Sequence, residues 1–144
     1  LDILMENMGR VNYGPEIELQ KKGITHGVLV NGTFHMGWDM YPLPLEDISK
    51  VDFARDYEEG MPAFYKFTFD AGETGDTFLD VTGFGKGCVF VNGKNIGRFW
   101  EAGPQRRLYI PGPLLREGTN EIILFETDGK AVETICLMDT PDLG

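Results

Sequence analysis

The chain has 144 residues, a length that fits one domain, or one domain and part of another. Its formal net charge is −10 at pH 7, and an acidic surface repels nucleic acid phosphates and anionic lipid head groups, so we expect neither nucleic acid nor membrane as a partner. Hydrophobic residues make up 42% of the chain, enough for a core, but no apolar run reaches the roughly 18 residues that span a bilayer.

Hydrophobic residues alternate with polar ones along almost the whole chain, which is the pattern of strands. The first predicted strands are the apolar run at 1–6 and the two halves of VLVNGTFHMGW at 28–38. A polar stretch at 44–59 could hold a helical turn and is interpreted as a connector. Later strands are predicted within 63–70, 76–83, 87–93, 94–100, 106–112, 120–126 and 134–139. With 19 glycines and 8 prolines for turns, the pattern predicts an all-β chain, a jelly-roll β-sandwich.

Two segments repeat the same arrangement of strand, Asn-Gly and strand. They are VLVNGTFHMGW at 28–38 and VFVNGKNIGRFW at 89–100, and their second strands end with Trp38 and Trp100. Asn-Gly strongly indicates a two-residue hairpin, because a type I′ turn needs a positive φ at both central residues. The repetition therefore predicts two hairpins of the same kind.

A second repetition suggests how the chain is organised. The runs LDILME at 1–6 and NEIILFE at 120–126 are both apolar and both end in Glu. The simplest interpretation is two related sandwiches in tandem: the terminal strands of an incomplete first one at 1–45, a connector at 46–59 and a second sandwich at 60–144. The alternative is that unrelated β chains look alike at this level of detail.

The residues give little support for metal or cofactor chemistry. His26 and His35 are nine residues apart and have no partner at metal-ligand spacing, so neither a metal nor a cofactor is expected. Cys88 and Cys136 each lie in an apolar run and are predicted to be buried thiols, with a disulfide between neighbouring strands as the alternative.

Carboxylate pairs occur in the polar stretch, at Glu46 and Asp47 and at Glu58 and Glu59. A solvated face explains these pairs better than general acid–base catalysis does. No nucleophile elbow, phosphate-binding loop or dinucleotide fingerprint is present in the sequence. The residues themselves therefore do not indicate an active site.

Two polar and aromatic clusters have the composition of a sugar site, in which aromatic faces and planar polar groups surround a pyranose. The first lies in the opening loop NMGRVNYG at 7–14, and the second at 95–105. The members of the two clusters are Asn7, Arg10, Asn12 and Tyr13, and then Asn95, Arg98, Phe99, Trp100 and Gln105. The structural alternative for the second cluster is that Arg98 and Trp100 pin a loop while Gln105 bonds backbone.

Long motifs in the chain resemble the C-terminal region of family-35 glycoside hydrolases, the β-galactosidases. The motifs are ENMGRVNYG at 6–14 and KGCVFVNGKNIGRFW at 86–100, followed by GPQ and LYIPGPLL. Departures are mild, with Phe84 and Phe99 at positions where Trp or Tyr is commoner. The resemblance covers almost the whole chain.

The resemblance implies an exo-acting, retaining β-galactosidase with a catalytic (β/α)₈ barrel followed by two galactose-binding-like jelly rolls. This chain resembles none of the barrel, so it is expected to lack the catalytic glutamates and to be inactive alone. It would pack on the barrel and help shape the pocket for the β-galactoside, with Tyr13 near the pocket rim and Arg10 at the interface. The alternatives are an autonomous carbohydrate-binding module and a purely structural or oligomerisation domain. The compartment stays open.

Overall fold

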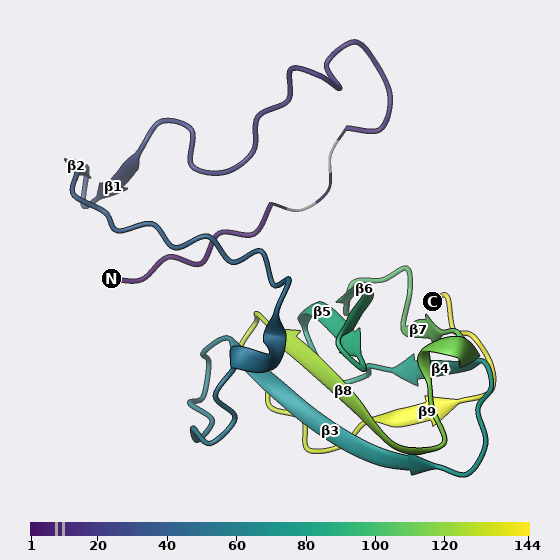
Figure 1. Cartoon of the computed structure of the whole chain (residues 1–144). Coiled ribbons are helices and arrows are strands. Elements are labelled where there is room, and N and C mark those ends of the chain that lie inside the picture. The colour runs from purple at the N-terminus through teal and green to yellow at the C-terminus, as the bar shows by residue number, and fades with distance from the viewer. Residues whose placement is uncertain (8, 10) are drawn as a thin grey trace. The chain divides into compact units, whose positions relative to one another are not determined.

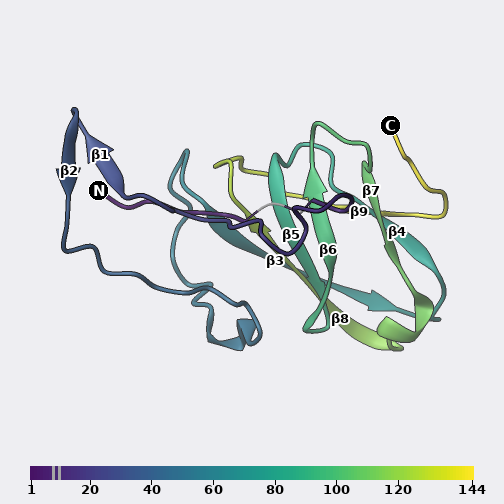
Figure 2. The ribbon, with the colours of Figure 1, turned by 90° about the horizontal axis from the view of Figure 1, so that it is seen from above.

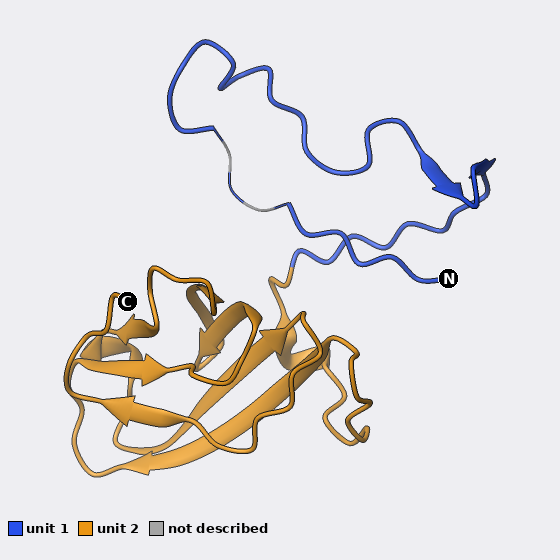
Figure 3. Cartoon of the chain, turned by 180° about the vertical axis from the view of Figure 1, so that it is seen from behind, with its two compact units in different colours: residues 1–44 blue, residues 45–144 orange. Residues whose placement is uncertain are grey.

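The computed structural model describes residues 1–7, 9 and 11–144. The chain forms two compact units, Leu1–Pro44 and Leu45–Gly144, which are coloured separately in Figure 3. Each unit is described by itself. The helical structure among the described residues consists of two short 3₁₀ turns, η1 (Ile48–Lys50) and η2 (Gly112–Leu114), and no described helix is long and apolar enough to cross a membrane.

Unit 2 is a sandwich of two antiparallel sheets (Figures 1 and 2). One sheet has four strands in the order β3-β8-β5-β6, and the other has three in the order β7-β4-β9. The strands are β3 (Ala63–Ala71), β4 (Thr77–Asp80), β5 (Lys86–Val91), β6 (Lys94–Trp100), β7 (Arg107–Ile110), β8 (Gly118–Glu126) and β9 (Cys136–Met138). Each lies within or next to a segment predicted as a strand, so the predicted all-β sandwich is confirmed.

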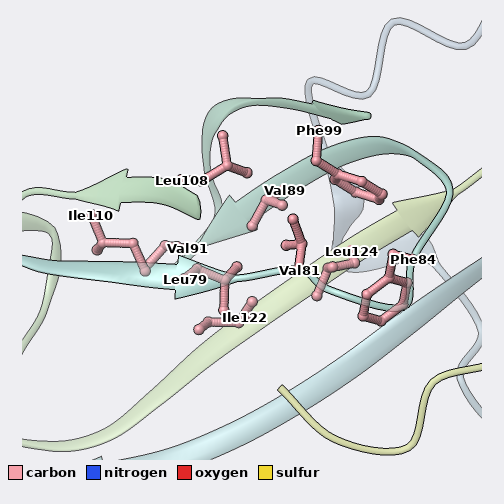
Figure 4. Packing of buried hydrophobic residues seen from close by; sticks show 10 residues of the cluster. All are labelled: Leu79, Val81, Phe84, Val89, Val91, Phe99, Leu108, Ile110, Ile122 and Leu124. Atoms are coloured by element: carbon pink, nitrogen blue, oxygen red, sulfur yellow. The ribbon is translucent and has the colours of Figure 1, made fainter. Parts of the chain in front are cut away.

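The core of unit 2 lies between the two sheets (Figure 4). Alternation along the strands explains its membership: Val89 and Val91 of β5 point inward, while Phe90 between them belongs to a separate cluster on the other face of the sheet. Leu79 of β4 and Leu124 of β8 supply the facing layers and are fully buried. Burying a side chain of this size contributes about 1.5–3 kcal/mol, so ten such residues are the main source of stability here.

The outer face of the four-stranded sheet is covered by the segment 45–53. Ile48 of η1 packs on Phe90 of β5 and Ile123 of β8. Asp47 is the N-cap of η1, its carboxylate accepting a hydrogen bond from the Ser49 backbone N–H. The helical turn predicted in 44–59 is therefore present, and the apolar side chains around it belong to the packing of unit 2. The predicted domain limits stay a prediction.

Both Asn-Gly pairs form the predicted hairpin turns. Asn31 and Gly32 have φ of 50° and 79°, and Asn92 and Gly93 have φ of 48° and 79°. The second turn is additionally fixed by its asparagine, whose Nδ2 donates to the Asn120 Oδ1 at 2.8 Å. Asn120 is fully buried, so this turn is tied directly to the inside of the sandwich.

Unit 1 contains one hairpin, formed by β1 (Val28–Val30) and β2 (Thr33–His35). The prediction of a strand at 1–6 is wrong, because these residues have no strand partner among the described residues and a strand needs one. The second strand of this hairpin also ends before Trp38, whose indole N–H donates to the His35 carbonyl at 2.9 Å. None of the described residues of unit 1 is buried.

Neither of the two cysteines forms a disulfide, so the thiol prediction is confirmed over its alternative. Cys88 is half-buried, but Cys136 is exposed, so its predicted burial is wrong. The reason is the phase of β9, in which Cys136 pairs with Asp80 of β4 on the outer face of the three-stranded sheet. An apolar run does not say which of its residues face outward when the strand has only three residues.

Candidate functional site

Strand β6 divides the second predicted cluster between two faces of its sheet. Phe99 points inward, is 2% exposed and meets Phe84 edge-to-face with ring centroids 5.8 Å apart. Trp100, the next residue, is 47% exposed. Because neighbouring side chains alternate across a strand, only one of these two aromatic residues can be offered to a ligand. Phe99 belongs to the hydrophobic core of unit 2.

Arg98 and Trp100 share the outer face of the four-stranded sheet. In the register with β5, Arg98 pairs with Cys88 and Trp100 pairs with Lys86. Asn95 acts locally instead, its Oδ1 accepting a hydrogen bond from the Gly97 backbone N–H at 2.9 Å, next to the register shift in this hairpin.

Gln105 lies in the connection between β6 and β7 and is exposed. A cis peptide bond between Gly103 and Pro104 precedes it in the same connection. No contact of the Gln105 side chain connects it to the rest of the cluster among the described residues, so its role stays a prediction.

Two ion pairs flank Trp100. Lys86 Nζ lies 3.3 Å from Asp128 Oδ1, and Lys130 pairs with Glu101. The hydrogen bond to Glu101 is the main reason that the pKa of Lys130 is raised. We call the group of Lys86, Arg98, Trp100, Glu101 and Lys130 the Trp100 surface: one half-exposed indole among charged groups, which can stack on an apolar face and bond hydroxyls.

A buried carboxylate that the sequence interpretation missed organises the loops around this surface. Glu126 is 0% exposed. Its Oε1 accepts from the backbone N–H groups of Gly85, Lys86 and Asp128 at 3.2, 3.3 and 3.1 Å. Its Oε2 accepts from the Lys130 N–H at 2.9 Å. The alternation along β8 could have indicated this position in the sequence. Glu126 follows Leu124 by two residues, so both side chains lie on the inward face of the strand.

The same network reaches the residue after Trp100. The Glu101 backbone N–H donates to the Gly85 carbonyl at 2.7 Å, while Gly85 itself donates to Glu126. The Glu101 side chain meets Lys130, whose backbone is held by Glu126 as well. The end of β6 is thus fixed on two sides by loops that depend on one buried carboxylate.

The opening loop lies in unit 1 and is exposed wherever it is described. Asn7 and Asn12 are exposed, and Tyr13 is 89% exposed. Arg10 lies outside the described residues. The loop is closed by a hydrogen bond of 2.8 Å from the Val11 backbone N–H to the Gln20 Oε1. At this exposure the phenol of Tyr13 is accessible to a partner molecule.

An apolar hollow of roughly 400 Å³ lies beside the edge strand β3. Its lining residues are Phe67, Thr68, Phe69, Ile122, Glu133, Thr134, Ile135 and Leu137. The sequence could not indicate it, because the inward residues of β3 have the pattern of ordinary core residues. It has few polar groups to orient a ligand.

The fold and these surfaces define an all-β accessory module, in which a sandwich presents polar and aromatic groups at its edge. Comparison with known families agrees. Residues 62–120 match the family described as "Beta-galactosidase, galactose-binding domain", and residues 1–44 match "Beta-galactosidase, first all-beta domain". The two matches together cover most of the chain, which therefore belongs to the β-galactosidase family, as its motifs predicted.

Curated relatives give the same result. The chain is 47% identical over 137 residues to "Beta-galactosidase 1" of Dictyostelium discoideum, covering 88% of this chain and 20% of that protein. It is 38% identical over 151 residues to "Beta-galactosidase-1-like protein 2" of Homo sapiens, covering 100% of this chain and 24% of that protein. "Beta-galactosidase 17" of Arabidopsis thaliana is 38% identical, with 92% and 22% covered. The chain spans about a fifth of the length of these relatives.

Proposed function

We propose that this chain is a non-catalytic accessory region of an exo-acting, retaining β-galactosidase, packing on the catalytic barrel and shaping its pocket for terminal β-linked galactose. The observation that carries the proposal is the order of the two family matches, a first all-β domain at 1–44 followed by a galactose-binding domain at 62–120. The relatives are about five times longer, which leaves room in them for a catalytic domain.

The exposed apolar residues of unit 1 support the same proposal. In the β1–β2 hairpin Leu29 pairs with Phe34, and both are largely exposed. Val28 and Val30 lie on the opposite face of the same strand and are half-buried. A hairpin with apolar side chains on both faces is suited to a position inside a larger sheet structure, covered from both sides. We propose that further strands of the first β domain provide this cover.

Tyr13 is the residue that we propose for the rim of the galactose pocket, with Asn7 and Asn12 beside it, and Arg10 for the interface with the barrel. The support is its 89% exposure in a loop rich in directional polar groups. A phenol can stack on the apolar face of a sugar and donate a hydrogen bond to it.

The test uses a full-length β-galactosidase that contains this chain. Tyr13→Phe and Tyr13→Ala should raise the KM for a chromogenic β-galactoside roughly two- to tenfold, the factor expected for one net hydrogen bond. Tyr41→Ala is the matched control, since Tyr41 is also an exposed tyrosine of unit 1 (81%), and it should leave KM unchanged. Unchanged kinetics in both Tyr13 variants would remove Tyr13 from the pocket.

The accessory role itself is tested on the 144-residue chain alone. We expect no hydrolysis of the chromogenic substrate and no heat when galactose is titrated calorimetrically. Turnover by the pure chain would contradict the non-catalytic assignment, and the carboxylates of the 44–59 stretch would then be the first to substitute.

An autonomous carbohydrate-binding module is the second candidate, and the 47% exposure of Trp100 favours it. In that case galactose binds the chain without turnover, and Trp100→Ala abolishes the heat, because stacking of an aromatic ring on the apolar face of the sugar provides much of the affinity of such sites. If the Trp100→Ala variant still released heat on titration with galactose, the Trp100 surface would be excluded as the binding site.

A further inference from the structure

The two Asn-Gly turns of the chain are matched in backbone but differ in how the asparagine side chain is held. Asn31-Gly32 joins β1 to β2, and Asn92-Gly93 joins β5 to β6. The φ angles are 50° and 79° in the first pair and 48° and 79° in the second. A Cβ atom added at either glycine would meet no heavy atom of a described residue within 4 Å, chain neighbours aside. The two pairs therefore share their sequence, their φ angles and the open space around the glycine.

An asparagine that precedes glycine can react with its own backbone, because glycine has no Cβ to obstruct the approach. The backbone nitrogen of the glycine gives its proton to a base in the solution, attacks the asparagine Cγ and closes a succinimide ring. The Cγ–Nδ2 bond breaks, and Nδ2 leaves as ammonia after taking up a proton. Water then adds to either ring carbonyl and breaks its bond to the ring nitrogen, which regains a proton. The product is aspartate or its isoaspartyl isomer, and the reaction consumes water and releases ammonia without any oxidant or reductant.

The carboxamide of Asn92 is held at both of its ends. Its Nδ2 donates to the Leu114 carbonyl and to the Asn120 Oδ1, both at 2.8 Å. Its Oδ1 accepts from the Glu121 backbone N–H at 3.0 Å, and the Asn92 backbone N–H donates to the Glu121 carbonyl at 2.9 Å. The Asn92 Cγ can turn towards the Gly93 nitrogen only after these side-chain bonds have broken.

Asn31 lies in a turn that is open to solvent. Asn31 and Gly32 are both exposed, and the strands that they join have three residues each. Among the residues that the structure describes, no hydrogen bond holds the Asn31 side chain. A two-stranded hairpin of this length is marginally stable and opens readily. The Asn31 Cγ can therefore reach the Gly32 nitrogen at little cost.

We propose that Asn31 is a site of spontaneous deamidation through a succinimide, and that the fold of unit 2 protects Asn92 from the same reaction. This modification goes beyond the proposed function and does not depend on it. Each of the three side-chain hydrogen bonds of Asn92 contributes a factor of roughly two to ten to the equilibrium against opening. Deamidation of Asn92 should therefore be roughly tenfold or more slower than deamidation of Asn31.

The product changes the hairpin of unit 1 in two ways. It adds a negative charge to a chain whose formal net charge is already −10. In the isoaspartyl form the main chain also runs through the former side chain, which lengthens a turn of two residues. The register in which Val30 pairs with Thr33 depends on the length and type of this turn, so the isoaspartyl form should lose it. The modification therefore acts on unit 1 and leaves the β5–β6 hairpin as it is.

The experiment follows both asparagines in the same sample. The folded 144-residue chain is kept at mildly alkaline pH in water enriched in the heavy oxygen isotope, and peptide mass mapping at intervals gives the rate at each position. We expect heavy oxygen to enter residue 31 roughly tenfold or more faster than residue 92. The same chain unfolded in urea is the control. There both positions should react at similar rates, because the bonds that hold Asn92 exist only in the fold.

Equal rates at the two positions of the folded chain would overturn the proposal, as would a faster reaction at Asn92. An unreactive Asn31 in the folded chain, over a time in which the unfolded chain reacts, would overturn it as well. Asn31→Gln is the variant that fixes the position, since its longer side chain would have to close a larger ring. This variant should lose the signal from residue 31 and keep the rate at Asn92. A signal that persisted in the same peptide would place the reaction at another residue and contradict the assignment to Asn31.

Discussion

The two units of the chain contain the same kind of hairpin turn, but the two hairpins differ in how far they are packed. Asn31-Gly32 and Asn92-Gly93 have nearly identical φ angles, yet the first joins strands of three residues and the second joins strands of six and seven. In unit 2 the hairpin is paired with β8 and packed on a second sheet, whereas no described residue of unit 1 is buried. An Asn-Gly pair therefore predicts the turn of a hairpin, but a stable hairpin also requires further strands beside it and a second sheet packed against it.

Matched phenylalanines give the largest test of this difference. Phe99→Ala in β6 should lower the free energy of unfolding of the 144-residue chain by about 3–5 kcal/mol, because it leaves a cavity in a closed core. Phe34→Ala in β2, where the ring is 59% exposed, should change it by less than about 0.5 kcal/mol. Urea unfolding monitored by circular dichroism measures both. Similar losses would mean that unit 1 has a core of its own.

Matched glutamates give an effect of intermediate size. Glu126→Ala removes the acceptor of four backbone N–H groups, one buried and three partly buried, and should cost about 3 kcal/mol. Glu18→Ala, an exposed position of unit 1, should stay within about 0.5 kcal/mol of the parent. Thermal unfolding of both variants provides the comparison. If Glu126→Ala proved as mild as Glu18→Ala, the loops around Trp100 would not depend on this carboxylate.

Acid should weaken unit 2 through Asp80, with the smallest effect of the three. Burial raises the pKa of Asp80, but hydrogen bonds from Thr82 and the pairing with Arg107 outweigh it, so the pKa lies below the ordinary value of 3.8. A carboxyl with a depressed folded pKa contributes stability above its unfolded pKa, and this is lost as the pH falls through the folded pKa. As the pH is lowered below 3.8, the free energy of unfolding should therefore decrease.

Asp80→Asn separates this contribution from that of other carboxyls. The variant should be less stable than the parent at neutral pH, and the difference between the two should shrink as the pH falls below 3.8. Melting temperatures between pH 7 and pH 2 give the measurement. A difference that stays constant over this range would show that Asp80 contributes no charged interaction.

Local patterns were sufficient to predict most of the fold, because alternation and Asn-Gly turns depend on neighbours in sequence. They did not reveal which predicted strands would have a partner strand. The run at 1–6 has the composition of a strand but forms none in this structure. Burial of Phe99 beside an exposed Trp100 depends on the phase of β6 and on which side the second sheet packs. The role of Glu126 depends on loops at 85–86 and 128–130, which are far from it in sequence or formed only after the strands pair.

The cover on the four-stranded sheet determines where unit 2 can be cut out for separate production. A boundary at residue 60, where the second sandwich was predicted to begin, would delete Ile48 and uncover Phe90 and Ile123. Such a truncation would present an apolar sheet face to solvent and would be prone to aggregate. A boundary before Leu45 keeps the cover, so the shortest soluble version of this unit should include a segment that, in sequence, has the composition of a linker.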